Sequence, residues 1–418
     1  MFLNFLKNSS LYLLALLIER SIIFIITPYL INEIPIDDFG TYSLFLTYES
    51  ALMPLVTLNL YSAISKEFYE DEYDFKERTF LLLLSYIILS ISSILITLVV
   101  YLFVPFLLPF SIDASIIAVL TGLLSSFLIY FQTFFKLKNK IFIYSLLSIT
   151  QSLLYFSIIF LATRYFYSDV TILFYSRLFL FFSILAILFY YTKSFHFSSN
   201  FQLIVSSLKL TLPTVIFSFS AFLFVMADRF FISNYLGKAA LGEYAAVYQI
   251  PALISLITGA FSTAWIPWLY ENLKYADHSK HIYLVKVIYL LIASLIIGSV
   301  VFFLLIPYLG SIIFSKTINF NSDYIIFIVL GFLFQGIYNL VSPLVFYSGK
   351  TKYHAYIGII VSVISILINF QLIPILGLKG ASITFCLSWF LLALLFFIAT
   401  FYSYKMPWFY FFNKSFRI

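Results

Sequence analysis

The sequence predicts an all-α membrane protein with about twelve transmembrane helices in two six-helix lobes. The composition, the apolar stretches and an internal repeat predict this fold. Of the 418 residues, 63% are hydrophobic and 10% are charged, and the mean hydropathy is +1.04. Soluble domains average about 45–50% apolar and about 25% charged residues. The chain therefore has too little polar surface for a water-soluble particle, which excludes soluble enzymes, secreted domains and nucleic-acid-binding proteins.

Each predicted helix is an apolar stretch long enough to cross about 30 Å of hydrocarbon. Backbone groups in lipid must form hydrogen bonds within the protein, and barrel strands would span only about ten residues, so the stretches are expected to be helices. The first six lie at about 9–31, 39–61, 80–104, 114–135, 141–163 and 170–192, and the second six at about 209–236, 242–266, 284–307, 323–347, 354–374 and 380–402. Prolines within these spans permit bends, because proline lacks the N–H of a helical hydrogen bond; examples are Pro28, Pro54, Pro213, Pro251 and Pro343.

The first stretch is predicted to be a retained helix rather than a signal peptide. Its apolar run is interrupted by Glu19 and Arg20, and no small-residue cleavage site follows. With this helix counted and the N-terminus inside, seventeen Lys and Arg residues fall in cytoplasmic segments and four in outer segments. Such an excess on the inner side is the pattern of the positive-inside rule, so both termini should be cytoplasmic.

Cysteine and histidine are scarce. One cysteine, Cys386, and four histidines leave no disulfide framework and no Cys/His cluster for a metal. We therefore expect neither a metal nor a cofactor.

The two halves of the chain repeat each other. Gly40 and Tyr42 correspond to Gly242 and Tyr244 at an offset of 202 residues, and a Lys-x-Lys at Lys138 recurs at Lys350 at an offset of 212. Six helices followed by six more return the chain to the same side, so the copies have the same orientation, as in transporters built from parallel repeats with a site between the lobes.

The repeat divides the chain into an N-terminal lobe and a C-terminal lobe. We predict that residues 1–192 form the first lobe and 209–402 the second. A polar cytoplasmic linker at 193–208 would join them, and 403–418 would form a cytoplasmic tail.

The second half carries two blocks of sequence that resemble a known family. One runs from Asp228-Arg229 through Gly237 to Gly242 and Tyr244. The other begins at Gly349-Lys350-Thr351-Lys352 and continues with Asn369, Pro374, Gly377 and Gly380. Together they resemble the polysaccharide exporters, or Wzx-type flippases, of the multidrug/oligosaccharidyl-lipid/polysaccharide (MOP) superfamily. The close match covers about 205–390, and the first half matches more loosely.

The resemblance implies a fold and a function. The fold would be two six-helix lobes around a V-shaped central cavity, like that of MATE transporters. The function would be flipping an undecaprenyl-diphosphate-linked oligosaccharide across the bacterial inner membrane by alternating access, for O-antigen, capsule or exopolysaccharide synthesis. The implied partners are this glycolipid, membrane lipid, and a polysaccharide polymerase and chain-length regulator. The glycines, Tyr244, Asn369 and Pro374 of the two blocks would have structural roles.

Three arginines lie within predicted spans: Arg20, Arg177 and Arg229. An arginine at mid-span costs about 2.5–3.5 kcal/mol on insertion scales, and such residues usually face a bundle interior or an aqueous cavity. Because guanidinium binds phosphate oxygens in a bidentate manner, these residues are candidates to hold the diphosphate. The alternative is a structural ion pair with a nearby carboxylate.

Glu19, Glu49 and Asp228 are the candidate carboxylates. Each could exchange a proton or cation during transport, since burial can raise the pKa of a carboxyl group, or could serve as a counter-ion to an arginine. Residues i and i+1 do not face each other on a helix, so Glu19 and Arg20 should each find a partner elsewhere.

Other functions remain open from the sequence. A cation-coupled multidrug antiporter of the same superfamily would need an acidic and aromatic site, and three arginines within spans argue against it. A glycan polymerase or ligase would need a long outer loop, which this chain lacks, and lipid II flipping is a further alternative. The four tryptophans are candidates either for stacking on sugars or for the more common anchoring at the membrane interface; they are Trp265, Trp268, Trp389 and Trp408.

Overall fold

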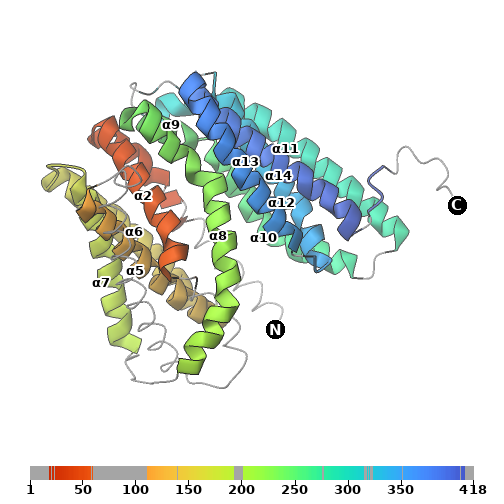
Figure 1. Cartoon of the computed structure of the whole chain (residues 1–418), viewed down its shortest axis with the longest axis horizontal. Coiled ribbons are helices and arrows are strands. Elements are labelled where there is room, and N and C mark those ends of the chain that lie inside the picture. The colour runs from red at the N-terminus through yellow and green to blue at the C-terminus, as the bar shows by residue number, and fades with distance from the viewer. Residues whose placement is uncertain are drawn as a thin grey trace. The chain divides into compact units, whose positions relative to one another are not determined.

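The structure of the chain is a computed structural model in which all the regular secondary structure of the described residues is helical (Figure 1). The described residues are 18–19, 21–22, 24–57, 59, 111–138, 140–192, 201–274, 277–314, 318, 320, 323–350, 352–404 and 406–409. Contacts divide the chain into two compact units. Unit 1 comprises residues 1–222 and 237–242, and unit 2 comprises 223–236 and 243–418.

Unit 1 is built around helix α5, which packs against α2, α6 and α7. Its core is aromatic, with the rings of Phe45 and Phe174 stacked at 4.2 Å and Tyr42 next to both. The described residues between 18 and 33 are helical and precede α2. The labelled helices are α2 (Ile36–Thr57), α5 (Ile112–Leu137), α6 (Ile141–Tyr165) and α7 (Thr171–Thr192).

Unit 2 is built around helices α12 and α14, which lie side by side in Figure 1. Helix α13 packs on α14, and α10 and α11 pack on α12. The helices are α10 (Ala252–Leu273), α11 (His278–Ile313), α12 (Ile325–Tyr347), α13 (Lys352–Leu376) and α14 (Leu378–Ser403). The units share two further helices, α8 (Phe201–Leu236) and α9 (Lys238–Gln249).

Eight helices among the described residues are long and apolar enough to cross a membrane. Seven of the predicted spans agree with one of them to within seven residues at either end. The predicted span 80–104 lies outside the described residues. Helix α8 begins at Phe201, inside the stretch predicted to be a linker, and the predicted lobe boundaries remain a prediction.

The predicted span 242–266 is wrong, because the structure divides it between α9 and α10. Ile250 and Pro251 form the break, and Pro251 has no N–H to continue the ladder of α9. The amides of Leu253 and Ile254 bond to the carbonyls of Ile250 and Pro251, three residues back, at 3.0 Å each. These two bonds form a tight turn, after which α10 begins as a separate helix.

Two signature glycines allow the sharp connections between consecutive helices. Gly237 joins α8 to α9 with φ +90°, and Gly377 joins α13 to α14 with φ +60°. Side chains other than glycine rarely adopt this left-handed region. Both junctions therefore depend on glycine.

Contacts at the helix ends show which ends lie on the same side of each unit. In unit 1, Tyr167 of the α6–α7 loop donates a hydrogen bond of 2.5 Å to Asp38 at the start of α2, and its burial and this bond raise the pKa of the phenol. In unit 2, Lys379 donates to Asp323 at 2.6 Å and lowers the pKa of that carboxyl, while at the opposite helix ends Lys350 donates to the carbonyl of Tyr402 at 2.6 Å.

Residues 406–409, which follow α14, pack into the core of unit 2. Trp408 is fully buried, donates its indole N–H to Thr400 at 3.1 Å, and accepts a bond from Tyr289 on its carbonyl at 2.6 Å. Trp265 is also buried and donates to the carbonyl of Leu340 at 3.2 Å. These two tryptophans are core residues, whereas the sequence favoured anchoring at the membrane interface.

Candidate functional site

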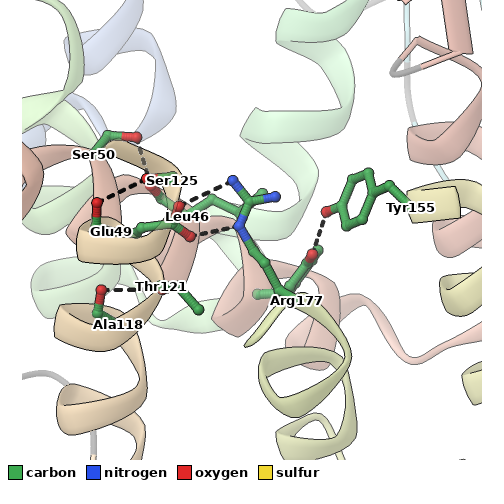
Figure 2. A network of polar contacts seen from close by, with 10 residues as sticks. Leu46, Glu49, Ser50, Ala118, Thr121, Ser125, Tyr155 and Arg177 are labelled. Carbon is green, nitrogen blue, oxygen red and sulfur yellow. Dashed lines mark hydrogen bonds and ion pairs between the residues drawn. The ribbon is translucent and has the colours of Figure 1, made fainter. Parts of the chain in front are cut away.

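An ion pair between α2 and α7 forms the centre of the candidate site in unit 1 (Figure 2). Arg177 donates from Nε to Glu49 Oε2 at 2.5 Å and from Nη2 to Glu49 Oε1 at 3.1 Å. The side chain of Glu49 is 5% exposed and that of Arg177 is 20% exposed. Two parallel hydrogen bonds between charged groups are the strongest form of such a pair. Glu49 is therefore the counter-ion of Arg177, a partner that the sequence alone could not identify.

Aromatic rings enclose the Arg177 guanidinium. Its Cζ lies 5.3 Å from the ring centre of Tyr155 and 5.1 Å from that of Phe181, which is cation–π geometry. The Tyr155 hydroxyl forms a hydrogen bond with the hydroxyl of Tyr42, so α2, α6 and α7 all contribute to the site. Figure 2 shows Tyr155 and Glu49 on opposite sides of the guanidinium.

The guanidinium of Arg177 retains unused donors. A guanidinium carries five N–H groups, and Arg177 uses Nε and one N–H of Nη2 on Glu49. Within the described part of the chain, the N–H groups of Nη1 have no protein acceptor. A partly exposed arginine with free donors can accept an anion without leaving its counter-ion.

The second candidate site lies in unit 2, where α8 meets α9. Asp228 and Arg229 are both buried, at 6% and 7% exposure. Asp228 accepts a bond of 2.8 Å from the Tyr244 hydroxyl and one of 2.9 Å from the amide of Arg229. The Arg229 guanidinium lies 5.1 Å from the ring centre of Tyr248, and its Nη1 contacts the sulfur of Met226.

The charged side chains of the two sites have different kinds of partners. Arg229 Nη1 is 3.9 Å from Asp228 Oδ1, which is close to the longest distance at which two such groups form a salt bridge. Each member has its closer partner elsewhere, as expected for residues i and i+1. The carboxylate therefore bonds chiefly to Tyr244, and the guanidinium lies chiefly on Tyr248.

The adjacent acid and arginine of the first half, Glu19 and Arg20, are only partly described. Glu19 is a half-buried helical residue, and Arg20 lies outside the described residues. The candidate role of Arg20 in holding the diphosphate therefore stays a prediction. The structure brings together Glu49 with Arg177 and Asp228 with Arg229, each pair within one unit.

The repeat is visible in the contacts of its glycines. A Cβ placed on Gly40 would lie 2.9 Å from the backbone nitrogen of Gly242, and one placed on Gly242 would lie 3.1 Å from the backbone nitrogen of Gly40. The former would also overlap the carbonyl of Lys238 and the latter that of Ile36, which again differ by 202 residues. The starts of α2 and α9 thus contact each other symmetrically within unit 1.

The ion pair of unit 1 has no charged counterpart in the second repeat. At the offset of 202 residues, Glu49 corresponds to Pro251 at the break before α10. At the offset of 212, Ser176-Arg177 on α7 corresponds to Ser388-Trp389 on α14. At these positions the two halves of the chain therefore carry different side-chain chemistry.

The remaining signature residues have structural positions in unit 2. Gly380 sits where a Cβ would overlap the carbonyl of Leu372, so α13 and α14 approach closely there. Pro374 lies inside α13, and Asn369 is 2% exposed on the same helix. Among the described residues, no three His, Cys, Asp or Glu side chains gather in a group that could hold a metal ion.

Sequence reasoning missed part of the aromatic surroundings of both sites. Tyr155 and Tyr248 contact the two guanidinium groups, and Tyr42 forms a hydrogen bond with Tyr155, but the chain has 33 tyrosines. The repeat did point to Tyr42 and Tyr244, which are both fully buried with their hydroxyls hydrogen-bonded. No comparable signal marked Tyr155.

The sequence profile of the polysaccharide biosynthesis protein family matches residues 5–273. The chain belongs to this family, and the resemblance found in its sequence is confirmed. No curated protein matches the chain.

Solved structures share the fold. Lipid II flippase MurJ in an inward closed conformation has a TM-score of 0.65 and 18% identity, covering 94% of this chain and 87% of its own. An inward-facing multidrug resistance MATE family transporter of the MOP superfamily has a TM-score of 0.64 and 13% identity, covering 91% and 93%. A MOP superfamily transporter from Pyrococcus furiosus, whose binding pocket is described as having reverse polarity, has a TM-score of 0.62 and 12% identity, covering 95% and 94%. The chain is an all-α, multi-span membrane protein with the fold of the MOP superfamily.

Proposed function

We propose that the protein is a flippase that moves an undecaprenyl-diphosphate-linked oligosaccharide across the bacterial inner membrane. The family match carries the proposal, because it places a chain with a transporter fold in polysaccharide biosynthesis. A glycolipid intermediate of that process has a charged diphosphate that cannot cross hydrocarbon unaided. The product would serve O-antigen, capsule or exopolysaccharide synthesis, with a polymerase and a chain-length regulator acting on it.

Arg177 is the residue best placed to hold the diphosphate. It is permanently charged, one fifth exposed, and has donors left over after Glu49. The buried carboxylate holds the guanidinium in position, and Tyr155 and Phe181 limit its movement. A phosphate oxygen can then bond to Nη1 while the polyprenyl chain stays in lipid. Arg20 and Arg229 are proposed to act on the same headgroup during alternating access.

The rival function is a cation-coupled multidrug antiporter. The MATE neighbour supports it at the level of the fold, and the Pyrococcus furiosus transporter indicates that pocket polarity differs among proteins of this fold. A site for cationic drugs needs negative charge that is not already neutralised. Glu49 is fully engaged by Arg177, so the geometry favours an anionic ligand.

The experiment measures flipping in proteoliposomes. The probe is a fluorescent polyprenyl diphosphate carrying one N-acetylglucosamine, and an impermeant quencher reports the fraction on the outer leaflet. We expect wild-type protein to flip it. Arg177→Ala should reduce the rate at least tenfold, because a hydrogen bond to a charged group contributes about 1.5–3 kcal/mol. Arg177→Lys should retain partial activity, since it keeps the charge and loses the planar fork.

Two controls separate binding from folding. Arg164→Ala removes an exposed arginine at the end of α6 and should have no effect. Arg177→Gln combined with Glu49→Gln removes both charges, so it avoids the uncompensated carboxylate that Arg177→Ala leaves behind. If the Arg177 variants flipped the probe at the wild-type rate, Arg177 would have no role in binding the headgroup. Transport of a lipophilic cation, with no flipping of the glycolipid, would favour the antiporter.

A further inference from the structure

A group of buried polar atoms in unit 2 has no partners in the protein. Trp389 Nε1, Gln335 Oε1 and Ser388 Oγ are each shielded from solvent and, within the described part of the chain, form no hydrogen bond. The other buried indoles differ, since Trp265 and Trp408 both donate. An unmade hydrogen bond of a buried group costs about 1–3 kcal/mol, so such groups need an explanation.

The indole of Trp389 lies where α14 packs against α8 and α12. The ring of Trp389 packs against Phe224 of α8, with centres 4.7 Å apart, and against Tyr338 of α12 at 5.9 Å. Gln335 lies one helical turn before Tyr338, on the same face of α12. Ser388 directly precedes Trp389 and, as its immediate neighbour on α14, faces a different side of the helix. Helices α12 and α14 therefore bring the indole of Trp389 next to the side of α12 that carries Gln335.

Trp389 is 6% exposed and Gln335 and Tyr338 are partly buried, but the Oε1 atom of Gln335 and the Nε1 atom of Trp389 are themselves shielded from solvent. A ligand can bond to these two atoms only after the side chains that cover them move aside. A hydroxyl group both donates and accepts, so it can satisfy the carbonyl of Gln335 and the N–H of Trp389.

The place of the cluster in the repeat suggests its ligand. Trp389 occupies the position that Arg177 occupies in the first repeat, at the offset of 212 residues. Arg177 supplies a permanent charge with a carboxylate partner, whereas Trp389 supplies a neutral donor on an aromatic ring. The same position of the sixth helix thus carries charged chemistry in one copy and neutral polar chemistry in the other.

We propose that Trp389 and Gln335 form a subsite for a neutral sugar of the lipid-linked substrate. Its hydroxyls bond to the indole N–H and the amide carbonyl, and its ring lies near Tyr338 and Trp389. The subsite rests on the proposed function, because it binds the uncharged part of the glycolipid whose diphosphate is assigned to Arg177.

The test compares the affinity of purified full-length protein in nanodiscs for two probes. One probe is undecaprenyl diphosphate without sugar, and the other is the same lipid carrying one N-acetylglucosamine. We expect the sugar to improve wild-type affinity about tenfold, as for one or two hydrogen bonds. Trp389→Phe and Gln335→Leu should bring this ratio close to one, with affinity for the sugar-free lipid unchanged.

Trp265→Phe is the matched control. It removes the N–H of a buried indole in the same unit whose bond to Leu340 is already made. It should lower the midpoint of thermal unfolding and leave the sugar ratio at the wild-type value. Trp389→Phe should leave the midpoint unchanged or raise it, because it removes a donor without a partner.

The outcomes separate this proposal from the proposed function. Failure of wild-type protein to bind either lipid would reject the flippase function, and the subsite with it. Binding of both lipids with equal affinity would reject the subsite alone. An unchanged sugar ratio in Trp389→Phe would show that the cluster holds only water, and an equal loss for both lipids would show a purely structural role.

Discussion

Glu49 and Asp228 are both buried carboxylates beside an arginine, but the structure holds them differently. Glu49 accepts two hydrogen bonds from the guanidinium of Arg177. Asp228 accepts from a tyrosine hydroxyl and a backbone amide, with its neighbouring guanidinium at 3.9 Å. A proton on Glu49 would have to displace a bidentate partner. Asp228 is therefore the better candidate for ion coupling, and Glu49 for a fixed counter-ion.

This difference predicts opposite effects of neutralisation. Asp228→Asn should weaken the dependence of flipping on a pH gradient, while Glu49→Gln should keep that dependence and lower the amount of folded protein. Flipping rates in proteoliposomes with and without a gradient, normalised to inserted protein, measure both effects. Unchanged gradient dependence in Asp228→Asn would make Asp228 a structural acceptor for Tyr244. Loss of dependence in Glu49→Gln would reverse the assignment.

The sequence revealed the charged residues of the sites and not their surroundings. Arg177, Arg229, Glu49 and Asp228 stood out because charge within an apolar span is costly. Pairing of Arg177 with Glu49 instead of another carboxylate depends on the packing of α2 and α7, which are separated by more than 100 residues. Tyr155 was hidden because a tyrosine is unremarkable in so aromatic a chain.

At the scale of helices, the sequence does not predict which prolines interrupt a helix. Pro251 ends α9, yet Pro54, Pro267, Pro307, Pro343 and Pro374 lie inside continuous helices. All remove one hydrogen bond, and whether the helix continues depends on what packs around it. Helix positions could thus be predicted from apolar length, whereas the division of one predicted span into α9 and α10 could not.

The contact between the starts of α2 and α9 predicts a strong effect of small substitutions. Gly40→Ala and Gly242→Ala should each destabilise the protein, because the added Cβ meets backbone atoms that cannot move aside. Gly259→Ala and Gly298→Ala are matched controls within helices, with no atom within 4 Å of the added Cβ. They should be neutral or slightly stabilising, since alanine favours helix by about 1 kcal/mol over glycine.

The measurement is the midpoint of thermal unfolding in detergent, together with flipping per inserted molecule. A midpoint for Gly40→Ala equal to that of Gly259→Ala would show that the two helix starts do not touch in the folded protein. Reduced flipping at an unchanged midpoint would instead show that the contact matters during the transport cycle.

At the scale of the whole molecule, the excess of basic residues predicts the orientation. Reporter fusions after residues 74 and 418 should read cytoplasmic, and one in the α6–α7 loop at Asp169 should read periplasmic. The bonds of Tyr167 to Asp38 and of Lys350 to Tyr402 support the relative sides of the helix ends within each unit. A periplasmic signal at residue 74 or 418 would overturn the predicted number of spans.

The symmetric contact of Gly40 with Gly242 also bears on the origin of the chain. Each glycine meets the residue that the repeat places opposite it, as in an isologous interface between two identical subunits. In an ancestor encoding a single half, both sides of this contact would have been one glycine of a homodimer. Any substitution would then have changed both sides at once. Duplication and fusion would have allowed the two copies to change independently, which fits a glycine present in both halves alongside Arg177 in one and Trp389 in the other.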